Sequence, residues 1–485
     1  MQRQDFLAAT ASAAALATVG ASPAAVAASI TRREISDVAR DPAALASLRK
    51  AVRLMRANTN DQDPLSWNYW WYVHYLPKRT MVVPPDLAGV WNACLHHQNY
   101  FYAWHRGYMY YFEKALQTVA GDPALALPYW DYFTNPRIPD VYAQKTLSDG
   151  SSNPLYDDSR DLKLGESLKG LDRFRRAFLP DVKTFPARSP KWQGIYEGEV
   201  DHGFHDDVHN QVGGNMGDQL FSAADPIFYA HHTQIDRLWT AWELADQGRS
   251  MPPPDYAPFW TRTFNYASRK APAKWALSVQ QMNDQTALGV AYADTTLPKP
   301  QPTTPVPARP PVVRPALAAN ALQTGELAAT GGIDLGPKSA TLSIPVSAPA
   351  RAKLREYAAK ADSPAEVVLE GVQLTPRGSK GGYSYHVFFN LPPQAGSTVN
   401  VQQYFIGSLG SFAISVAAHG HGGMPSGSNL TFALSPALRA QAAANALGGD
   451  HVTLSFVLQG TPKNVPPGTP LVKIARVHID GLGPQ

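Results

Sequence analysis

The stretch DPIFYAHHTQID, residues 225–236, places two adjacent histidines and a carboxylate on one expected helix. His232 and Asp236 are four residues apart, so on a helix both side chains project from the same face. His205 and His209 repeat this spacing on a preceding helix. Imidazole is a common ligand of copper and zinc, and Asp236 can accept a hydrogen bond from the ring nitrogen that faces away from the metal. The pattern favours a metal site over a pair of surface or capping histidines.

A second group of histidines lies upstream, at His74, His96, His97 and His105. Nine of the 14 histidines fall between positions 74 and 232, where they form these two groups. Scattered core histidines rarely group in this way. Two three-histidine clusters on separate helical hairpins predict a dinuclear metal centre.

Length and composition limit the other classes. A chain of 485 residues is too long for one ordinary core, and its 44% hydrophobic content supports two or three folded units. The formal net charge of +4 is mild, and no run of Lys or Arg or nucleic-acid motif is present, so no nucleic-acid partner is expected. No segment after the N-terminus is apolar enough to span a membrane.

Residues 1–28 predict a signal peptide, so we expect an exported protein, either periplasmic or secreted. Arg3 supplies the positive start, Phe6–Gly20 is an apolar run, and Ala25–Ala27 offers a small-residue cleavage site. Arg3 and Gln4 resemble a twin-arginine signal with its second arginine replaced. The choice between general secretion and twin-arginine export therefore stays open.

The remaining chain predicts a mainly helical metal-binding domain at residues 29–297 and an all-β, sandwich-like domain at residues 319–485. Prolines concentrated within residues 298–318 predict a stiff linker between them. Helices are expected over residues 32–58, within 64–120, and over 202–211 and 225–246. The expected strands are Ala340–Val346, Glu366–Leu374, Tyr383–Leu391, Phe412–Ala417, Val452–Leu458 and Leu471–Ile479.

Two motifs resemble those of the tyrosinase family of dinuclear copper proteins. The first consists of His96, Phe101, Trp104, His105, Arg106, Met109 and Glu113. The second consists of Asp225, Pro226, Phe228, Tyr229, His232 and Asp236. The resemblance runs from about Arg32 to Tyr292 and implies a helical bundle around two copper ions.

The resemblance also implies a ligand set. Copper A would be held by His74, His96 and His105, and copper B by His205, His209 and His232. His74 rests on its spacing and the aromatic run before it. His97 and His231 are interpreted as packing residues beside ligands, and His202 is an alternative one helical turn before His205. Six histidines without a ligating carboxylate suit copper better than the zinc of a hydrolase.

Cys94 is the single cysteine, so an intrachain disulfide is excluded. In an extended segment Cys94 and His96 face the same side. The Cys-x-His arrangement resembles that of fungal tyrosinases, in which a thioether joins the two side chains. We favour this thioether over a buried free thiol.

The family resemblance implies an oxidoreductase that uses O2 to convert o-diphenols to o-quinones and, in tyrosinases, to hydroxylate monophenols. The alternatives are a catechol oxidase or o-aminophenol oxidase without monophenolase activity, and a hemocyanin-like oxygen carrier. The expected partners are O2 and small phenols. A copper-loading partner is a further candidate that the sequence leaves open.

The residues around the ligands depart from the family pattern. Glu197 is the candidate for the glutamate that holds a catalytic water, and Asp206 stands where bacterial tyrosinases usually have asparagine. Asp206 would either act as a base or disturb the water network. Asn210 follows His209, and Gln219 stands where plant catechol oxidases carry a phenylalanine over copper A. Gln219 predicts a less obstructed, more polar entrance.

The C-terminal part resembles, more weakly, the C-terminal domain of plant polyphenol oxidases. The similar segments are Leu369–Val372, Tyr385–Asn390, Phe405–Gly407, Gly410–Phe412 and His419–His421. In that family the domain lies over the active site and keeps the enzyme latent. The resemblance therefore implies a lid, with the proline-rich linker as its cleavage or hinge region.

Overall fold

The structure is a computed structural model that describes residues 30–78, 80–96, 100–178, 200–245, 257–267, 275–299, 306–315, 321–359, 365–394, 403–419, 428–444, 447–460, 462–463 and 465–481. The chain divides into two compact units. Unit 1 comprises Met1–Ser167, Pro180–Asp201 and Gln219–Pro298, and unit 2 comprises Leu168–Leu179, His202–Asp218 and Lys299–Gln485. The signal peptide predicted at residues 1–28 lies outside the described residues.

Unit 1 is mainly helical. The helix expected over residues 32–58 is present as α2 (Ile35–Ala39) and α3 (Pro42–Ala57), which are separated at Asp41. The Asp41 carboxylate accepts the backbone N–H of Ala44 and Pro42 is the first residue of α3, so this junction carries a strong helix-start signal. Leu45, Leu48, Val52 and Met55 are buried along one face of α3, as their spacing predicts.

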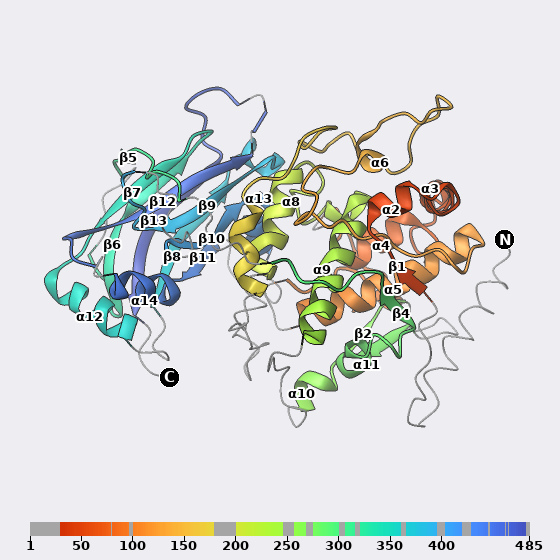
Figure 1. Ribbon diagram of the computed structural model, residues 1–485, viewed down its shortest axis with the longest axis horizontal. Coiled ribbons are helices and arrows are strands. Elements are labelled where there is room, and N and C mark those ends of the chain that lie inside the picture. Colours follow the sequence, from red (N-terminus) through yellow and green to blue (C-terminus); the bar gives the residue numbers. More distant parts are fainter. Residues whose placement is uncertain are drawn as a thin grey trace. The chain divides into compact units, whose positions relative to one another are not determined.

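Three helices bring the histidines of unit 1 into its core. They are α4 (Trp67–His74), α5 (Phe101–Ala120) and α9 (Ile227–Leu244), and α5 packs against α9 (Figure 1). Gly121 ends α5 with a φ of 66°, in the left-handed region that glycine tolerates. The smaller elements of the unit are η1 (Pro85–Leu87), α6 (Asp140–Ala143), η4 (Ser222–Ala224), α10 (Ala257–Trp260) and α11 (Val279–Asn283).

Two short strand pairs complete unit 1. Strand β1 (Ile30–Arg32) pairs in parallel with β4 (Val290–Tyr292), and β2 (Thr263–Asn265) pairs antiparallel with β3 (Ala276–Ser278). The β1–β4 pair joins the first described residues of the unit to its last strand. Arg32, at the end of β1, is thereby carried into the interior.

Unit 2 contains two sheets. The first has the order β10 (Phe405–Gly410), β9 (Tyr383–Phe389), β12 (His451–Gly460), β7 (Ala340–Pro345) and β5 (Val312–Val313). The second has the order β11 (Ser428–Ala433), β8 (Ala365–Leu374), β13 (Val472–Gly481) and β6 (Glu326–Leu335). Side chains from both sheets, such as Leu342, Leu454, Leu369 and Val477, share one apolar core. The predicted combination of a helical domain and a C-terminal β-sandwich is confirmed.

Helices also belong to unit 2. They are η2 (Leu171–Phe178), the π-helical turn η3 (Val200–His205, in unit 2 from His202), α8 (Asp206–Val212), α12 (Ala348–Ala359), η5 (Gly378–Lys380), α13 (Ser411–His419) and α14 (Ser435–Ala443). The strand predicted at Phe412–Ala417 is wrong, because this segment forms α13. Strands β6, β10 and β11 were not predicted. None of the described helices combines the length and hydropathy needed to span a bilayer.

Candidate metal centre

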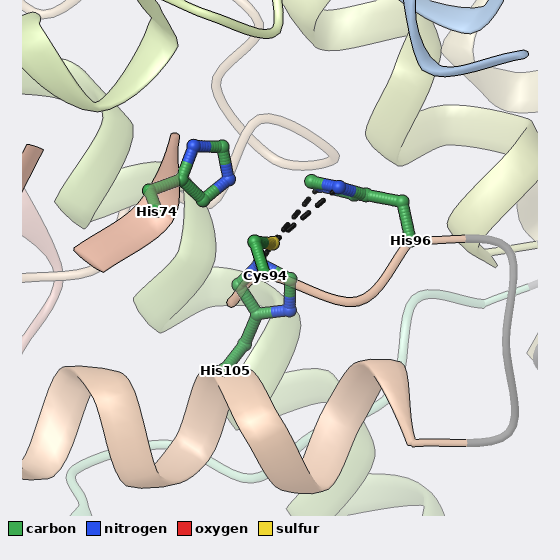
Figure 2. Close-up of side chains that lie close together, drawn as sticks. All are labelled: His74, Cys94, His96 and His105. Carbon is green, nitrogen blue, oxygen red and sulfur yellow. Dashed lines mark hydrogen bonds between the residues drawn. The ribbon is translucent and has the colours of Figure 1, made fainter. Parts of the chain in front are cut away.

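The first histidine group lies wholly within unit 1. His74 is the last residue of α4, His105 belongs to the second turn of α5, and Cys94 and His96 come from the segment between these helices (Figure 2). One ligand atom from each of these four residues lies within 4.8 Å of the other three, and all four side chains are buried. The structure therefore brings together His74, His96 and His105, the three histidines that the resemblance assigns to copper A.

The ring of His105 is held in a defined orientation. Its Nδ1 donates a hydrogen bond to the carbonyl oxygen of Phe101, at 2.8 Å, one helical turn earlier. That bond fixes the tautomer and leaves Nε2 as the nitrogen with a lone pair for a metal. The Sγ atom of Cys94 lies 3.4 Å from this Nε2.

Aromatic rings enclose the first group. Phe228 lies edge-on to His74 with ring centroids 4.8 Å apart, and Tyr75 stacks on His96 at 6.0 Å. The rings of His105 and His232 are stacked at 4.2 Å with an interplanar angle of 13°. This apolar surrounding excludes water and favours neutral imidazoles over imidazolium ions.

Cys94 is positioned for the predicted thioether. Its Sγ lies 3.4 Å from Nδ1 and 3.8 Å from Nε2 of His96 (Figure 2). Burial, assisted by the charge of Asp201, raises the pKa of the Cys94 thiol well above its ordinary value. The thioether itself stays a prediction.

The second group includes His205 and His209 of unit 2. His205 ends η3 and His209 lies in α8, and their ring centroids are 4.7 Å apart. Nδ1 of His209 donates to the carbonyl oxygen of Met216 at 2.8 Å, whereas Nδ1 of His205 lies 3.1 Å from Oδ1 of Asp206. Both bonds leave Nε2 for a metal, as in His105.

Phe412 lies against this pair. Its ring stacks on that of His209, with centroids 4.0 Å apart and an interplanar angle of 12°, and it meets His205 edge-on at 5.4 Å. Asn210 accepts the backbone N–H of Phe412 through Oδ1 at 2.7 Å. Asn210 was predicted as a residue near the ligands, but the sequence did not reveal this contact. The similarity of Gly410–Phe412 to plant polyphenol oxidases was the only signal for it.

His231 and His232 lie on α9 in unit 1, where both are buried. His231 faces Tyr132, with ring centroids 5.6 Å apart, and one of its ring nitrogens lies within 4.8 Å of one of His232, so its packing role stays a prediction. The hydrogen bond predicted between His232 and Asp236 is wrong. Both oxygens of Asp236 instead accept from Arg106, Arg32 and Tyr292, because two buried guanidinium groups compete for this carboxylate.

The other predicted residues have mixed outcomes. Glu197 and His97 lie outside the described residues, and His202 is exposed. Gln219 is 1% exposed and hydrogen-bonds the buried Tyr75, so it does not form an exposed rim. Arg32, which sequence reasoning missed as a functional residue, pairs with Glu113 and Asp236.

The donor sets fit copper. Among the described residues, each group offers at least two buried imidazoles whose ring nitrogens lie within 4.8 Å of one another, and the first group includes no carboxylate. Imidazole nitrogens of this kind suit copper well, whereas oxygen-rich sites suit magnesium or calcium. The ligand set stays a prediction at the level of single residues.

Comparisons with known proteins define the class. Residues 64–169 and 142–245 match the family model described as the common central domain of tyrosinase. A tyrosinase from Hahella sp. (strain CCB-MM4) is 29% identical over 248 residues, which cover 42% of this chain and 51% of that relative. A chloroplastic polyphenol oxidase from Malus domestica is 27% identical over 365 residues, covering 67% of this chain and 59% of that relative. The chain thus spans about half the length of these relatives.

The fold has a counterpart among solved structures. The structure of latent apple tyrosinase matches with a TM-score of 0.59 and 21% identity, covering 95% of this chain and 98% of that one. The match extends over the helical and the β-rich parts. Residues 64–245 therefore carry a domain that matches the tyrosinase family model, and the chain is similar to tyrosinases and polyphenol oxidases. The two histidine groups fit a dinuclear copper centre.

Proposed function

We propose that this protein is a copper-dependent phenol oxidase that uses O2 to convert o-diphenols to o-quinones. The observation that carries the proposal is the convergence of His74, His96 and His105 in a buried aromatic surrounding within the family domain. His205, His209 and His232 are proposed as the ligands of the second copper. A pair of copper ions supplies the two-electron chemistry with O2 that no side chain provides.

The protein itself contributes orientation and shielding. The carbonyl oxygens of Phe101 and Met216 hold the rings of His105 and His209, so little reorganisation is needed when copper binds. The ring face of His209 accepts a flat aromatic group, as its stacking on Phe412 illustrates. A phenol ring placed on the same face would be oriented by the same stacking interaction.

We further propose that monophenols are a second substrate class, as in a tyrosinase. Two residues bear on this point. Glu197 lies outside the described residues, and Asp206 is engaged with His205. A catechol oxidase or o-aminophenol oxidase is the alternative, and it is favoured if neither residue is available as a base.

The test is a set of parallel oxygen-uptake assays on copper-loaded protein. The substrates are an o-diphenol, a monophenol and an o-aminophenol, and copper per chain is determined on the same sample. Two copper ions per chain with o-diphenol turnover support the proposal, and chelator-treated protein serves as the inactive control. Protein that loads two copper ions and binds O2 reversibly without turnover is an oxygen carrier. Zinc as the sole bound metal revives the hydrolase alternative.

We also propose that the C-terminal part keeps the enzyme latent through Phe412. Phe412 covers the ring face of His209 that a substrate would use. Limited proteolysis near residues 298–315 tests the proposal, because removal of the C-terminal part should increase activity. Unchanged activity after complete cleavage would contradict it.

Export is proposed from residues 1–28. Determination of the N-terminus of the mature protein checks it, since a start near residue 28 is expected. A requirement for a copper-loading partner is tested by comparing copper content after expression with and without added copper.

A further inference from the structure

The carboxylate of Asp206 differs from the other groups that hold candidate ligands. Nδ1 of His105 and Nδ1 of His209 donate to neutral main-chain carbonyl oxygens, of Phe101 and Met216. Nδ1 of His205 instead faces Oδ1 of Asp206 at 3.1 Å. One candidate copper ligand is therefore paired with a carboxylate group, and the other two with neutral main-chain carbonyls.

Burial strengthens the interaction between the Asp206 carboxylate and the His205 ring. Both His205 and Asp206 are completely buried, at 0% exposure. Bulk water therefore does not screen the pair, and a carboxylate on the far nitrogen makes the imidazole a stronger donor. A stronger, more negative donor stabilises Cu(II) relative to Cu(I), because the additional charge interacts more favourably with the doubly charged ion.

We propose that Asp206 is a positioning residue that orients His205 and raises the preference of its copper site for Cu(II). This inference rests on the proposed function, because it requires His205 to bind copper. It differs from a role as catalytic base: Oδ1 of Asp206 is directed at His205, so the carboxylate acts on the metal through that ring.

Asp207 provides a matched control. It is the next residue of α8 and is also buried at 0% exposure. Its carboxylate accepts hydrogen bonds from Gln211, Ser408 and His386, at 2.7, 3.2 and 3.3 Å. Asp207→Asn therefore removes a buried carboxylate from the same helix turn without removing a partner of a candidate ligand.

The experiment compares copper affinities in both oxidation states. Copper-loaded wild type, Asp206→Asn, Asp206→Ala and Asp207→Asn are titrated with a Cu(II) chelator in air and with a Cu(I) chelator under anaerobic reducing conditions. Asp206→Ala should weaken the binding of one of the two Cu(II) equivalents by about 10–100-fold, the usual effect of losing such a partner. Asp206→Asn keeps an acceptor oxygen and should restore much of the copper content.

The decisive measurement is the Cu(II)/Cu(I) affinity ratio of that equivalent. In Asp206→Asn it should fall about tenfold, which for a one-electron couple corresponds to about 59 mV. In Asp207→Asn it should stay close to that of wild type. Equal shifts in the two asparagine variants, or an Asp206→Ala variant that holds both copper ions as wild type does, would overturn the inference. So would loss of monophenol turnover in Asp206→Asn with unchanged affinities, which identifies a base.

Two further measurements keep the outcome interpretable. Unfolding midpoints of the copper-free proteins report whether each variant folds. If Asp206→Ala does not fold, the affinity ratios of the two asparagine variants still test the inference. Turnover of o-diphenol by wild type is measured separately. A wild type that binds two copper ions without turnover refutes the proposed function but leaves the comparison of affinities valid.

Discussion

At the scale of single residues, three of the candidate imidazoles are oriented by an oxygen near their Nδ1 atoms. Phe101 O, Met216 O and Asp206 Oδ1 serve His105, His209 and His205. The motifs predicted the histidines because their spacing on helices is visible in the sequence. The oxygen partners were not predicted, because two of them are main-chain carbonyls that any residue type supplies.

His105→Ala should reduce the bound copper from two to about one per chain and abolish o-diphenol oxidation, because a copper site that loses one of three imidazoles binds its ion far more weakly. Copper quantification after desalting measures the effect. His202→Ala is the control, since His202 is exposed although it lies near the ligands in sequence. Loss of copper in His202→Ala, with retention in His105→Ala, would show that the ligand set is misassigned.

Asp236 shows where reasoning from spacing failed. Asp236 lies on the same helix as His232, as the sequence predicts. Its carboxylate, however, binds Arg32, Arg106 and Tyr292 instead of His232. Arg32 lies 204 residues away in the chain, and nothing in the local pattern shows that its charge is buried. Glu113 is occupied in the same way, since it accepts two hydrogen bonds from Arg32.

Arg32→Gln should lower the free energy of unfolding by about 3–5 kcal/mol, because it leaves the buried Glu113 without its cation and Asp236 with Arg106 alone. Arg33→Gln should change it by about 0–1 kcal/mol, since the Arg33–Asp41 pair is more than one third exposed. Chemical denaturation of the copper-free proteins, followed by Trp fluorescence, measures both. Equal effects of the two adjacent substitutions would contradict the assignment of Arg32 to the core.

At the scale of elements, α13 shows how a distant contact decides between helix and strand. The apolar run Phe412–Ala417 is short, and such a run is ambiguous between a strand and a buried helix. Its first turn is completed by Asn210, whose Oδ1 accepts the backbone N–H of Phe412 and, at 3.4 Å, the hydroxyl of Ser411. Because Asn210 is about 200 residues away, the outcome was not readable locally.

Gly410→Ala should release Phe412 from His209 and raise the activity of the uncut enzyme. A Cβ atom at Gly410 would lie 2.3–2.5 Å from the amide group of Asn210, so the segment must move. Overpacking of this kind costs about 1–3 kcal/mol. If this cost destabilises the conformation in which Phe412 covers His209, the activity of the uncut enzyme should rise by about 5–150-fold.

Gly448→Ala is the control for this substitution, because a Cβ atom there meets no atom within 4 Å. Assays before and after proteolysis separate relief of latency from a change in the copper site. The two variants should reach the same activity once the C-terminal part is removed. A Gly410→Ala enzyme as latent as wild type would contradict the role of Phe412.

At the scale of the whole molecule, the predicted combination of a helical part with a β-rich C-terminal part is confirmed, but two short segments could not be assigned to their unit from the sequence. Leu168–Leu179 and His202–Asp218 belong to unit 2, although the β-rich part begins far later in the chain. Lys169 and Gln211 bind each other through two hydrogen bonds, and Arg173 and Asp207 both contact His386 of β9. The contacts of His386 join segments about 200 residues apart, and the sequence alone does not reveal them.

The buried His386 should make unit 2 less stable in acid. Its Nδ1 accepts from Arg173 at 2.9 Å and its Nε2 donates to Asp207 at 3.3 Å, an arrangement that requires the neutral ring. Burial lowers the pKa of His386 below its ordinary value, against the opposing effect of Asp207. The unfolded chain therefore takes up this proton at higher pH, and the stabilisation is present above about pH 6.5 and lost as pH falls below it.

His386→Gln provides the test, since a glutamine amide can donate to Asp207 and accept from Arg173 but does not titrate in this range. The loss of stability between about pH 7.5 and about pH 5.5, which bracket the ordinary histidine pKa, should be smaller in the variant than in wild type. Denaturant midpoints of the copper-free proteins measure it. An identical pH dependence would show that other groups cause the acid sensitivity.

The pairing of β1 with β4 has a consequence for synthesis of the chain. Arg32 contacts Tyr292 across 260 residues, so the first and last of the described strands of unit 1 pair with each other. During translation Arg32 emerges early and must wait, still hydrated, until residues near 292 have left the ribosome. We therefore expect the buried contacts of Arg32 with Asp236 and Tyr292 to form late, because they close long loops at an entropic cost. We therefore expect the candidate ligands His74 of α4 and His105 of α5 to be accessible to solvent, and to any metal present, before the chain encloses them.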